Sequence, residues 1–190
     1  ICCKSPDKLA LIERRFGVNA TTSLDTILND SEVKGIFVCT SPQSHYEICS
    51  RVIASGKYLF VEKPPCQTLE QLEYLIAADK QQVAMVGMQK RYSPIIWTLK
   101  KQLAKSKPIN YTLSYHTGLY PEGNPLTDLF IHPVDLVLYL FGNAELKSVQ
   151  QIDRNGTMTI QGLISHGTAK GYIELSTAYS WTNPKETLYV

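Results

Sequence analysis

Over residues 1–89, short apolar runs alternate with amphipathic segments. The apolar runs cover residues 35–40, 58–63 and 83–88, and polar or proline residues bound each of them. Such runs are typical of parallel strands that are buried on both faces. Strands that alternate with helices through short loops predict a parallel sheet with helices on both faces.

Capping residues indicate where the intervening helices begin and end. The Ser-Pro-Asp sequence at residues 5–7 supplies a helix start, and Gly17 supplies its stop. Thr68 and Gln71 form the capping-box pattern at the head of a helix with one apolar side. A further helix is expected over residues 45–55.

The pattern changes after about Gln89. A helix is expected from Ser93 to about Lys105, and a largely apolar segment follows at 127–141. The remaining apolar stretches are expected to be strands, and they cover residues 109–116, 145–152, 157–165 and 168–179. Asn155-Gly156 is a strong hairpin signal between two of them. The chain is therefore predicted to contain two domains, residues 1–89 with a parallel sheet and residues 90–190, an α+β domain with an antiparallel sheet.

The composition is that of a globular protein and excludes several classes. The 190 residues are 44% hydrophobic and 19% charged, and a net charge of +2 gives no sign of a nucleic-acid or membrane-surface partner. No apolar run approaches the roughly 18 residues that cross a bilayer. The five cysteines are odd in number and lack metal-ligand spacing, which favours a reducing, cytoplasmic setting over a disulfide framework or a zinc site. Cys39, inside an apolar run, is expected to be a small buried residue.

Polar residues follow two of the predicted strands directly. Thr40 ends the first apolar run, and Glu62, Lys63 and Pro64 end the second. Ligands on parallel sheets bind outside the carboxyl ends of the strands, so these residues are expected to face a binding site. The alternative for Lys63 is a surface salt bridge with a nearby acid.

A second polar group lies on the apolar segment 127–141. Asp128, His132 and Asp135 are spaced i, i+4, i+7, which predicts that they share one helix face. Buried polar groups need partners or a purpose. Three interpretations stay open: hydrogen bonds to neighbouring backbone, a metal site with few ligands, and a proton-transfer site in which His132 works beside Lys63. Pro133 allows an irregular turn before the helix begins.

Four sequence pieces together resemble the glucose–fructose oxidoreductase/inositol dehydrogenase (Gfo/Idh/MocA) family of NAD(P)-dependent oxidoreductases. The pieces are VCTSPQSHYEIC, GKYLFVEKPP, MVGMQKRYSP and TDLFIHPVDLVLYLFG, and they occur in the family's order. The resemblance implies a Rossmann-like parallel sheet followed by an α+β domain. It also implies an enzyme that transfers a hydride between a nicotinamide cofactor and a hydroxyl or carbonyl group of a small polyol, sugar or related molecule.

The resemblance further implies roles for individual residues. Lys63, in the Glu-Lys-Pro motif, matches the family's usual proton donor or acceptor, and Asp128 and His132 match its Asp and His. Asp135 matches an acid that often follows the His, where it either supports the site or takes part in catalysis. Phe130 stands where the family has a glycine.

On the cofactor side, the resemblance places Thr40, Pro42 and His45 near the dinucleotide and Glu62 near its nicotinamide end. Arg91 matches the Arg-Tyr-x-Pro segment, where a structural or substrate-edge role is expected. The residue types suit the reaction, because a lysine amine can accept the alcohol proton when burial or a cationic neighbour disfavours its charge. A neighbouring histidine can share that proton or orient the hydroxyl.

The family's glycine-rich phosphate turn is not found in the sequence. No G-x-G-x-x-G motif occurs, and alignment by pattern places residues 1–3 on the second strand, so the first βα unit is expected to precede residue 1. Where an acid would bind the ribose of NAD, the chain has Cys3, followed by Lys4 and Ser5. The expected cofactor is NAD or NADP, with a weak lean to NADP, and Lys4 and Ser5 are expected near the ribose. No resident metal is expected.

Three functions remain open. The first is an NAD(P)-dependent oxidoreductase acting on CH–OH groups, and the second is a catalytically silent dinucleotide- or ligand-binding regulator on the same fold. The third is an interaction module that uses the open sheet of the second domain for pairing. The expected partners are a small-molecule substrate and a second copy of the chain, bound through the open antiparallel sheet, with no nucleic acid and no membrane. Residues 115–125 are expected to line the substrate side, and the identity of the substrate lies beyond the sequence.

Overall fold

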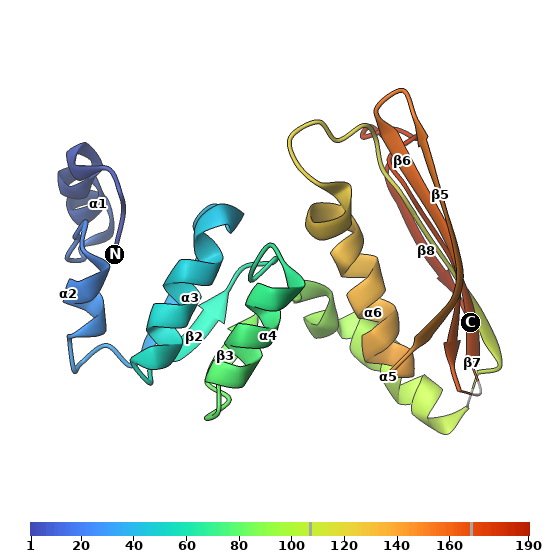
Figure 1. The fold of residues 1–190 in the computed structure, drawn as a ribbon, viewed down its shortest axis with the longest axis horizontal. Helices are drawn as coiled ribbons and strands as arrows, with labels where there is room; N and C mark the ends of the chain where they lie inside the picture. Colours follow the sequence, from blue (N-terminus) through green and yellow to red (C-terminus); the bar gives the residue numbers. More distant parts are fainter. Residues whose placement is uncertain (107, 168) are drawn as a thin grey trace. The chain divides into compact units, whose positions relative to one another are not determined.

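The computed structural model describes residues 1–106, 108–167 and 169–190. These residues form two compact units, Ile1–Gly87 and Met88–Val190, called here the first and the second unit (Figure 1). Thr168, the first residue of an expected strand, lies outside the described residues. Within the described ranges, no helix is long and apolar enough to span a membrane.

The first unit contains a parallel sheet in the strand order β1-β2-β3. Its strands are β1 (Gly35–Val38), β2 (Tyr58–Val61) and β3 (Ala84–Val86). Its helices are η1 (Pro6–Lys8), α1 (Leu9–Phe16), α2 (Leu24–Leu28), η2 (Pro42–Ser44), α3 (His45–Ala54) and α4 (Leu69–Ala78). The predicted parallel α/β arrangement is confirmed.

Helix ends in this unit follow the capping residues of the sequence. Gly17 ends α1 at φ 64°, in the left-handed region that glycine adopts without a steric penalty. The Thr68 side chain accepts a hydrogen bond from the Gln71 N–H at 3.2 Å. The Gln71 side chain in turn accepts from the Gln67 N–H at 3.0 Å, so both polar ends of the cap are satisfied.

The two faces of the parallel sheet differ in burial. Ile36, Val38, Leu59 and Val61 point towards α3 and α4 and form the core of the unit with residues of these helices. Successive residues of a strand alternate between faces, so a second row of side chains points the other way, and Phe37 in it is 76% exposed. The prediction that this strand is buried on both faces is therefore wrong. The prediction for Cys39 is wrong as well, because β1 ends at Val38 and leaves Cys39 exposed.

The second unit has a mixed five-stranded sheet in the order β5-β6-β7-β4-β8. Its strands are β4 (Asn110–His116), β5 (Glu145–Arg154), β6 (Thr157–His166), β7 (Ala169–Ser176) and β8 (Lys185–Tyr189). Its helices are η3 (Gln89–Tyr92), α5 (Pro94–Lys105), the π-turn η4 (Leu126–Phe130) and α6 (Ile131–Phe141). The predicted α+β class is confirmed, with one correction to the sheet: β4 pairs with β7 in parallel. A parallel pair needs a long crossover, and the segment through α6, β5 and β6 supplies it.

Helix α6 lies along one face of this sheet (Figure 1). Phe130 and Val137 pack there with apolar residues of three strands, among them Leu113 and Leu175. On the same face, a side chain at Gly171 would collide with the Tyr111 ring, since its Cβ would lie 2.0 Å from a ring carbon. Burial raises the pKa of Tyr111 to about 12, so its hydroxyl stays protonated and can hydrogen bond inside the fold.

The opposite face carries a hydrogen-bonded carboxylate, Glu174. Its Oε2 accepts a bond from Gln161 Nε2 at 2.9 Å, and its Oε1 accepts one from the Tyr179 hydroxyl at 3.2 Å and lies 2.8 Å from His116 Nε2. The bond from Gln161, with those of His116 and Tyr179, outweighs burial and lowers the pKa of Glu174.

A lowered folded-state pKa makes Glu174 an acid-sensitive source of stability. Its contribution is present above the unfolded pKa of about 4.3 and is lost as the pH falls through the lower folded value. We expect Glu174→Gln to reduce the free energy of unfolding most above about pH 5, with the difference from wild type shrinking below about pH 4. Urea unfolding followed by tryptophan fluorescence reports on this unit, because both tryptophans of the chain, Trp97 and Trp181, lie in it. The exposed Glu145→Gln is the control, and a pH-independent loss in Glu174→Gln would contradict the prediction.

Candidate active site

The carboxyl edge of the parallel sheet brings several predicted residues together. The backbone hydrogen bonding between neighbouring strands continues one residue past their ends. The Glu62 N–H donates to the Val38 carbonyl at 3.0 Å, and the Gly87 N–H donates to the Val61 carbonyl at 2.8 Å. Thr40, Glu62 and Lys63 therefore follow neighbouring strands at one edge of the sheet. This is the edge where open α/β sheets bind ligands.

Lys63 is the half-buried cation of this edge. It directly follows Glu62, and its peptide bond to the buried Pro64 is cis. The Glu62 carboxylate extends across the end of β3, where a Cβ at Gly87 would lie 3.4 Å from both carboxylate oxygens and 3.0 Å from the Phe60 ring. Gly87 therefore leaves room chiefly for the Phe60 ring, whereas the Glu62 oxygens would be in ordinary contact with such a Cβ.

The residues after β1 form a tight turn. Pro42 opens η2, and the Ser44 hydroxyl donates to the Thr40 hydroxyl at 2.8 Å. His45 begins α3 and is 1% exposed. Its Nδ1 lies 2.7 Å from the Pro64 carbonyl oxygen and its Nε2 lies 2.9 Å from the Thr40 carbonyl oxygen. The structure thus places His45 beneath the edge, with both ring nitrogens engaged by backbone.

Two buried thiols lie close to this turn in the fold. Cys49 is one helical turn beyond His45 on α3, and Cys66 is two residues beyond Pro64. Burial raises the pKa of Cys49 to about 11, and it also raises the pKa of Cys66. Thiols that stay protonated behave as small apolar groups, so they support the edge by packing rather than by reacting.

The residues predicted near the ribose lie at the start of the chain. Cys2 forms an isolated parallel bridge with Thr21, and the Cys3 N–H donates to the Thr21 carbonyl at 3.0 Å. Lys4 is exposed, and the Ser5 N–H contacts the Cys3 sulfur at 3.4 Å. The extended pairing predicted for residues 1–3 is therefore present as a single bridge, and Lys4 follows it in a loop.

Asp128 organises the loop before α6. It accepts hydrogen bonds from the Asn124 N–H at 3.0 Å and the Thr127 hydroxyl at 3.1 Å. The Tyr120 hydroxyl lies 3.4 Å from the same carboxylate, and the pKa of Tyr120 is raised by burial and by the negative charge of Asp128. Gly123 passes so close that its Cβ would lie 2.2 Å from an Asp128 oxygen. Asp128 therefore fixes the loop that was predicted to line the substrate side.

The helix expected over residues 127–141 consists of two parts. The π-turn η4 precedes α6, which confirms the irregular turn that Pro133 allows. Phe130, at the junction, is 1% exposed and meets the Tyr115 ring edge to face at a centroid distance of 6.3 Å. It therefore anchors the junction in the core, where a glycine would leave a void. His132, half-buried, follows on the first turn of α6.

Asp135 shares a face of α6 with His132, three residues earlier. Its carboxylate binds the Arg91 guanidinium through two nitrogens, with Nε 2.9 Å and 3.1 Å from the two oxygens and Nη2 on one of them. The hydrogen bond to Asp135 is the main cause of a raised pKa at Arg91. Arg91 thus ties the segment after Met88 to the helix that carries His132.

A double-mutant cycle measures the coupling energy between Arg91 and Asp135, whose bidentate ion pair is called here the fork. Because two guanidinium nitrogens bind one largely buried carboxylate, Arg91→Ala and Asp135→Ala are expected to show a coupling energy of about 1–2 kcal/mol. Arg91→Lys keeps the charge and loses the fork, so it is expected to lose most of the coupling. Urea unfolding of the four proteins of the cycle gives the coupling directly. If the double mutant loses as much free energy of unfolding as the two single mutants together, the fork does not stabilise the unit.

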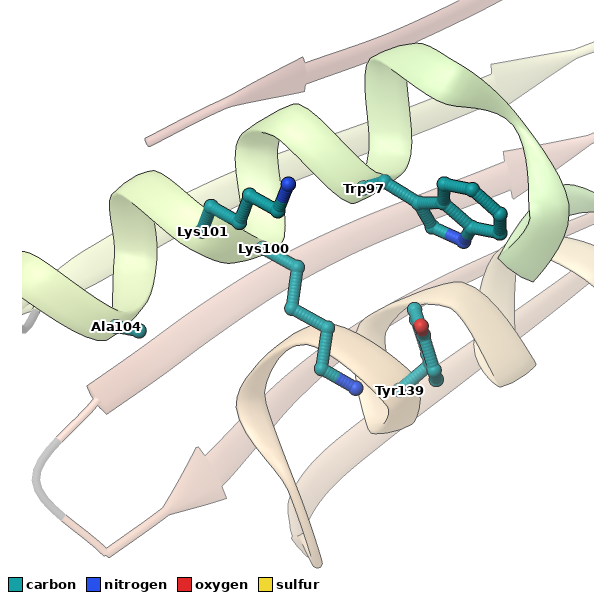
Figure 2. A pocket seen from close by; sticks show the side chains of 5 residues that line it. All are labelled: Trp97, Lys100, Lys101, Ala104 and Tyr139. Carbon is teal, nitrogen blue, oxygen red and sulfur yellow. The ribbon is translucent and has the colours of Figure 1, made fainter.

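A shallow pocket on α5 and α6 contains none of the predicted site residues. Trp97, Lys100, Lys101, Ala104 and Tyr139 line it (Figure 2). The Lys100 amine sits over the Tyr139 ring at 3.4 Å from its centroid, a cation–π contact. Among the described residues, no group of three or more His, Cys, Asp and Glu side chains could hold a metal ion. The predicted residues of the first unit lie at the carboxyl edge and at the start of the chain, and those of the second unit lie in η4 and α6.

The first unit is a parallel α/β sheet with polar strand ends, and comparison with known proteins shows which family has this domain. Residues 1–90 match the model of the oxidoreductase family with an NAD-binding Rossmann fold. The chain is 26% identical over 186 residues to the uncharacterized oxidoreductase YhhX of Escherichia coli, covering 88% of this chain and 54% of that one. It is 32% identical over 124 residues to inositol 2-dehydrogenase of Paracoccus denitrificans, covering 60% of this chain and 37% of that one.

A solved structure shows the same fold. The oxidoreductase from Agrobacterium radiobacter, in complex with NAD⁺, L-tartaric acid and magnesium, has a TM-score of 0.82 at 19% identity, covering 99% of this chain and 62% of that one. These findings support the glucose–fructose oxidoreductase/inositol dehydrogenase family, whose NAD-binding domain model matches residues 1–90. It spans about half the length of YhhX and 37% of the inositol dehydrogenase.

Proposed function

We propose that the complete protein is an NAD(P)-dependent oxidoreductase that transfers a hydride between the nicotinamide and a CH–OH or carbonyl carbon of a small polyol, sugar or related molecule. The observation that carries the proposal is the position of Lys63, which follows Glu62 just beyond β2 at the carboxyl edge of the parallel sheet, the edge that also carries Thr40. The inositol dehydrogenase among the relatives supports the substrate class.

The residues at this edge suit the reaction. The nicotinamide, when bound, supplies the hydride acceptor carbon. Lys63 takes the hydroxyl proton as the carbinol hydrogen leaves, and returns it in the reverse direction. Thr40, Pro42 and Glu62 offer exposed or half-exposed groups to the cofactor at the strand ends.

The proposal assigns His132 and Asp128 of the second unit to the same reaction. His132 orients the substrate hydroxyl or shares its proton with Lys63, and Asp128 holds the loop at 120–127 that meets the substrate. Asp135 and Arg91 keep the His132 helix in place through their fork.

A substrate panel tests the proposal. The complete protein is mixed with NAD or NADP and with polyols, sugars and hydroxy acids, and formation of the reduced nicotinamide is followed by absorbance. We expect reduction with at least one compound of these classes. Tight cofactor binding without reduction by any of them would favour the silent ligand-binding regulator.

We expect a weak preference for NADP over NAD. Cys3 stands where an acid would repel the 2′-phosphate, and the exposed Lys4 follows it. Lys4→Glu is expected to shift the preference towards NAD, while Lys8→Glu makes the same charge change farther along the chain and serves as the control. Fluorescence titration with both cofactors measures the preference, and clearly tighter binding of NAD by the wild type would contradict it.

We also propose that a second copy of the chain binds through the sheet of the second unit. Apolar side chains are exposed on the edge strand β5, with Leu146 at 55% and Val149 at 56%, and on its neighbour β6, with Leu163 at 51%. The register places Leu146 and Val149 on the face that bears α6 and Leu163 on the opposite face, so apolar surface is exposed on both faces at this end of the sheet. Sedimentation of the complete protein tests the proposal, and a monomer at all concentrations would contradict it.

A further inference from the structure

His45 connects two neighbouring strand ends through one buried ring. Its Nδ1 lies 2.7 Å from the carbonyl oxygen of Pro64, in the segment after β2, and its Nε2 lies 2.9 Å from that of Thr40, in the segment after β1. The ring is 1% exposed, so water does not compete for these contacts. Both segments carry residues of the candidate site, and the ring holds them at a fixed separation.

The chemistry of the two partners restricts how the ring can bind them. Carbonyl oxygens only accept, whereas a neutral imidazole has one N–H and one acceptor nitrogen. Two hydrogen bonds of this length therefore require a proton on each ring nitrogen. A neutral ring would direct a lone pair at one carbonyl inside the protein, an arrangement that leaves a buried acceptor unpaired.

The second unit offers an internal comparison. His166 Nδ1 lies 2.8 Å from the Gly142 carbonyl oxygen, and its Nε2 lies 2.8 Å from the Tyr111 hydroxyl. A hydroxyl can donate as well as accept, so a neutral His166 ring satisfies both partners. The two histidines make equal numbers of contacts and differ in the chemistry of one partner.

We propose that His45 is a positioning residue for Lys63, donating from both ring nitrogens to hold the Pro64 carbonyl against the Thr40 carbonyl. Pro64 directly follows Lys63, so fixing its carbonyl fixes the backbone from which the Lys63 amine extends. His45 does not touch the substrate, because its ring is buried and both nitrogens are engaged. This inference rests on the proposed function, in which the Lys63 amine handles the proton.

The protonation of the ring is measured without any activity. Nitrogen-15 NMR of histidine side chains in the complete protein distinguishes a ring with two protonated nitrogens from one with a single proton. His45→Gln and His166→Gln identify the two signals by their loss. We expect the His45 ring to carry an N–H on both nitrogens, because both of its partners are carbonyl oxygens. A bare nitrogen on His45 would overturn the proposal.

Kinetics test whether His45 acts through Lys63. Glutamine cannot donate in two opposite directions, so His45→Gln is expected to slow hydride transfer roughly 10- to 100-fold, the size expected when a reacting group is misplaced by about 1 Å. Cofactor affinity is expected to change by less than about threefold, because the phosphate and ribose contacts that dominate it lie elsewhere. His166→Gln is expected to leave the rate unchanged.

The Lys63→Met background separates positioning from a merely structural role. If His45 acts through Lys63, then His45→Gln adds no further loss when Lys63 is already methionine. The proposal would be overturned if His45→Gln slowed hydride transfer equally in the wild type and in Lys63→Met. It would also be overturned if a weaker cofactor affinity accounted for the slower rate. If the wild type transfers no hydride, the proposed function fails instead, and the NMR measurement on the wild type still decides the state of the His45 ring.

Discussion

Replacing Lys63 with methionine is expected to reduce hydride transfer by about 10²- to 10⁴-fold, the usual cost of removing a general acid–base group. Methionine keeps much of the length and apolar surface of the lysine stem, so the half-buried position stays filled and the protein stays folded. Cofactor affinity is expected to change far less, since most dinucleotide binding comes from phosphate and ribose contacts. Single-turnover absorbance of the reduced nicotinamide measures the rate.

The control for this substitution is Lys80→Met, which removes an exposed lysine at the end of α4 and is expected to leave the rate unchanged. His132→Asn is expected to lower the rate as well. If Lys63 and His132 act as a unit, the double mutant loses less than the product of the two single losses. Full activity in Lys63→Met would reject its role in proton transfer.

Truncating Phe130 to alanine is expected to cost about 3–5 kcal/mol of stability in the second unit, the range for removing a buried aromatic ring. Phe130 is 1% exposed and packs with Val137 and Leu113 between α6 and the sheet, so its loss leaves a cavity at the junction of η4 and α6. Urea unfolding followed by tryptophan fluorescence measures the loss.

Leu138→Ala is the matched control on the same helix. Leu138 is 41% exposed, and its truncation is expected to cost less than about 1 kcal/mol, since little apolar surface is lost from contact. Similar losses for the two substitutions would show that Phe130 is not the anchor of α6.

The elements of the fold were predictable where the cause is local. Gly17 ends its helix because the chain turns left-handed there, and Thr68 begins another because its hydroxyl binds the Gln71 N–H. These effects depend on residues a few positions apart. The alternation of apolar runs and helices then determined the parallel order of β1, β2 and β3.

Features that depend on distant parts of the chain were not predictable in this way. The parallel pairing of β4 with β7 joins segments on either side of a long crossover, and no short pattern records it. The exposure of Phe37 depends on which face of the sheet α3 and α4 cover, whereas an apolar run looks the same with one or two buried faces.

In the candidate site, too, features with a local cause were predictable and contacts between distant residues were not. Lys63 and Glu62 were found because a charged pair at the end of an apolar run has no structural reason to be there. The contacts of His45 were not found, because they join Thr40 and Pro64, whose carbonyls come together only in the folded sheet. The fork between Arg91 and Asp135 likewise joins residues 44 positions apart.

Isotope transfer tests the proposed chemistry most directly. The complete protein is incubated with oxidised cofactor and an active polyol that carries deuterium on its carbinol carbon, and the reduced cofactor is examined by mass spectrometry. Hydride transfer predicts that the reduced nicotinamide carries the deuterium, and that Lys63→Met forms the same labelled product more slowly. Reduced cofactor without deuterium, or bound cofactor that is never reduced by any polyol, sugar or hydroxy acid, would contradict the assignment of this protein as a dehydrogenase.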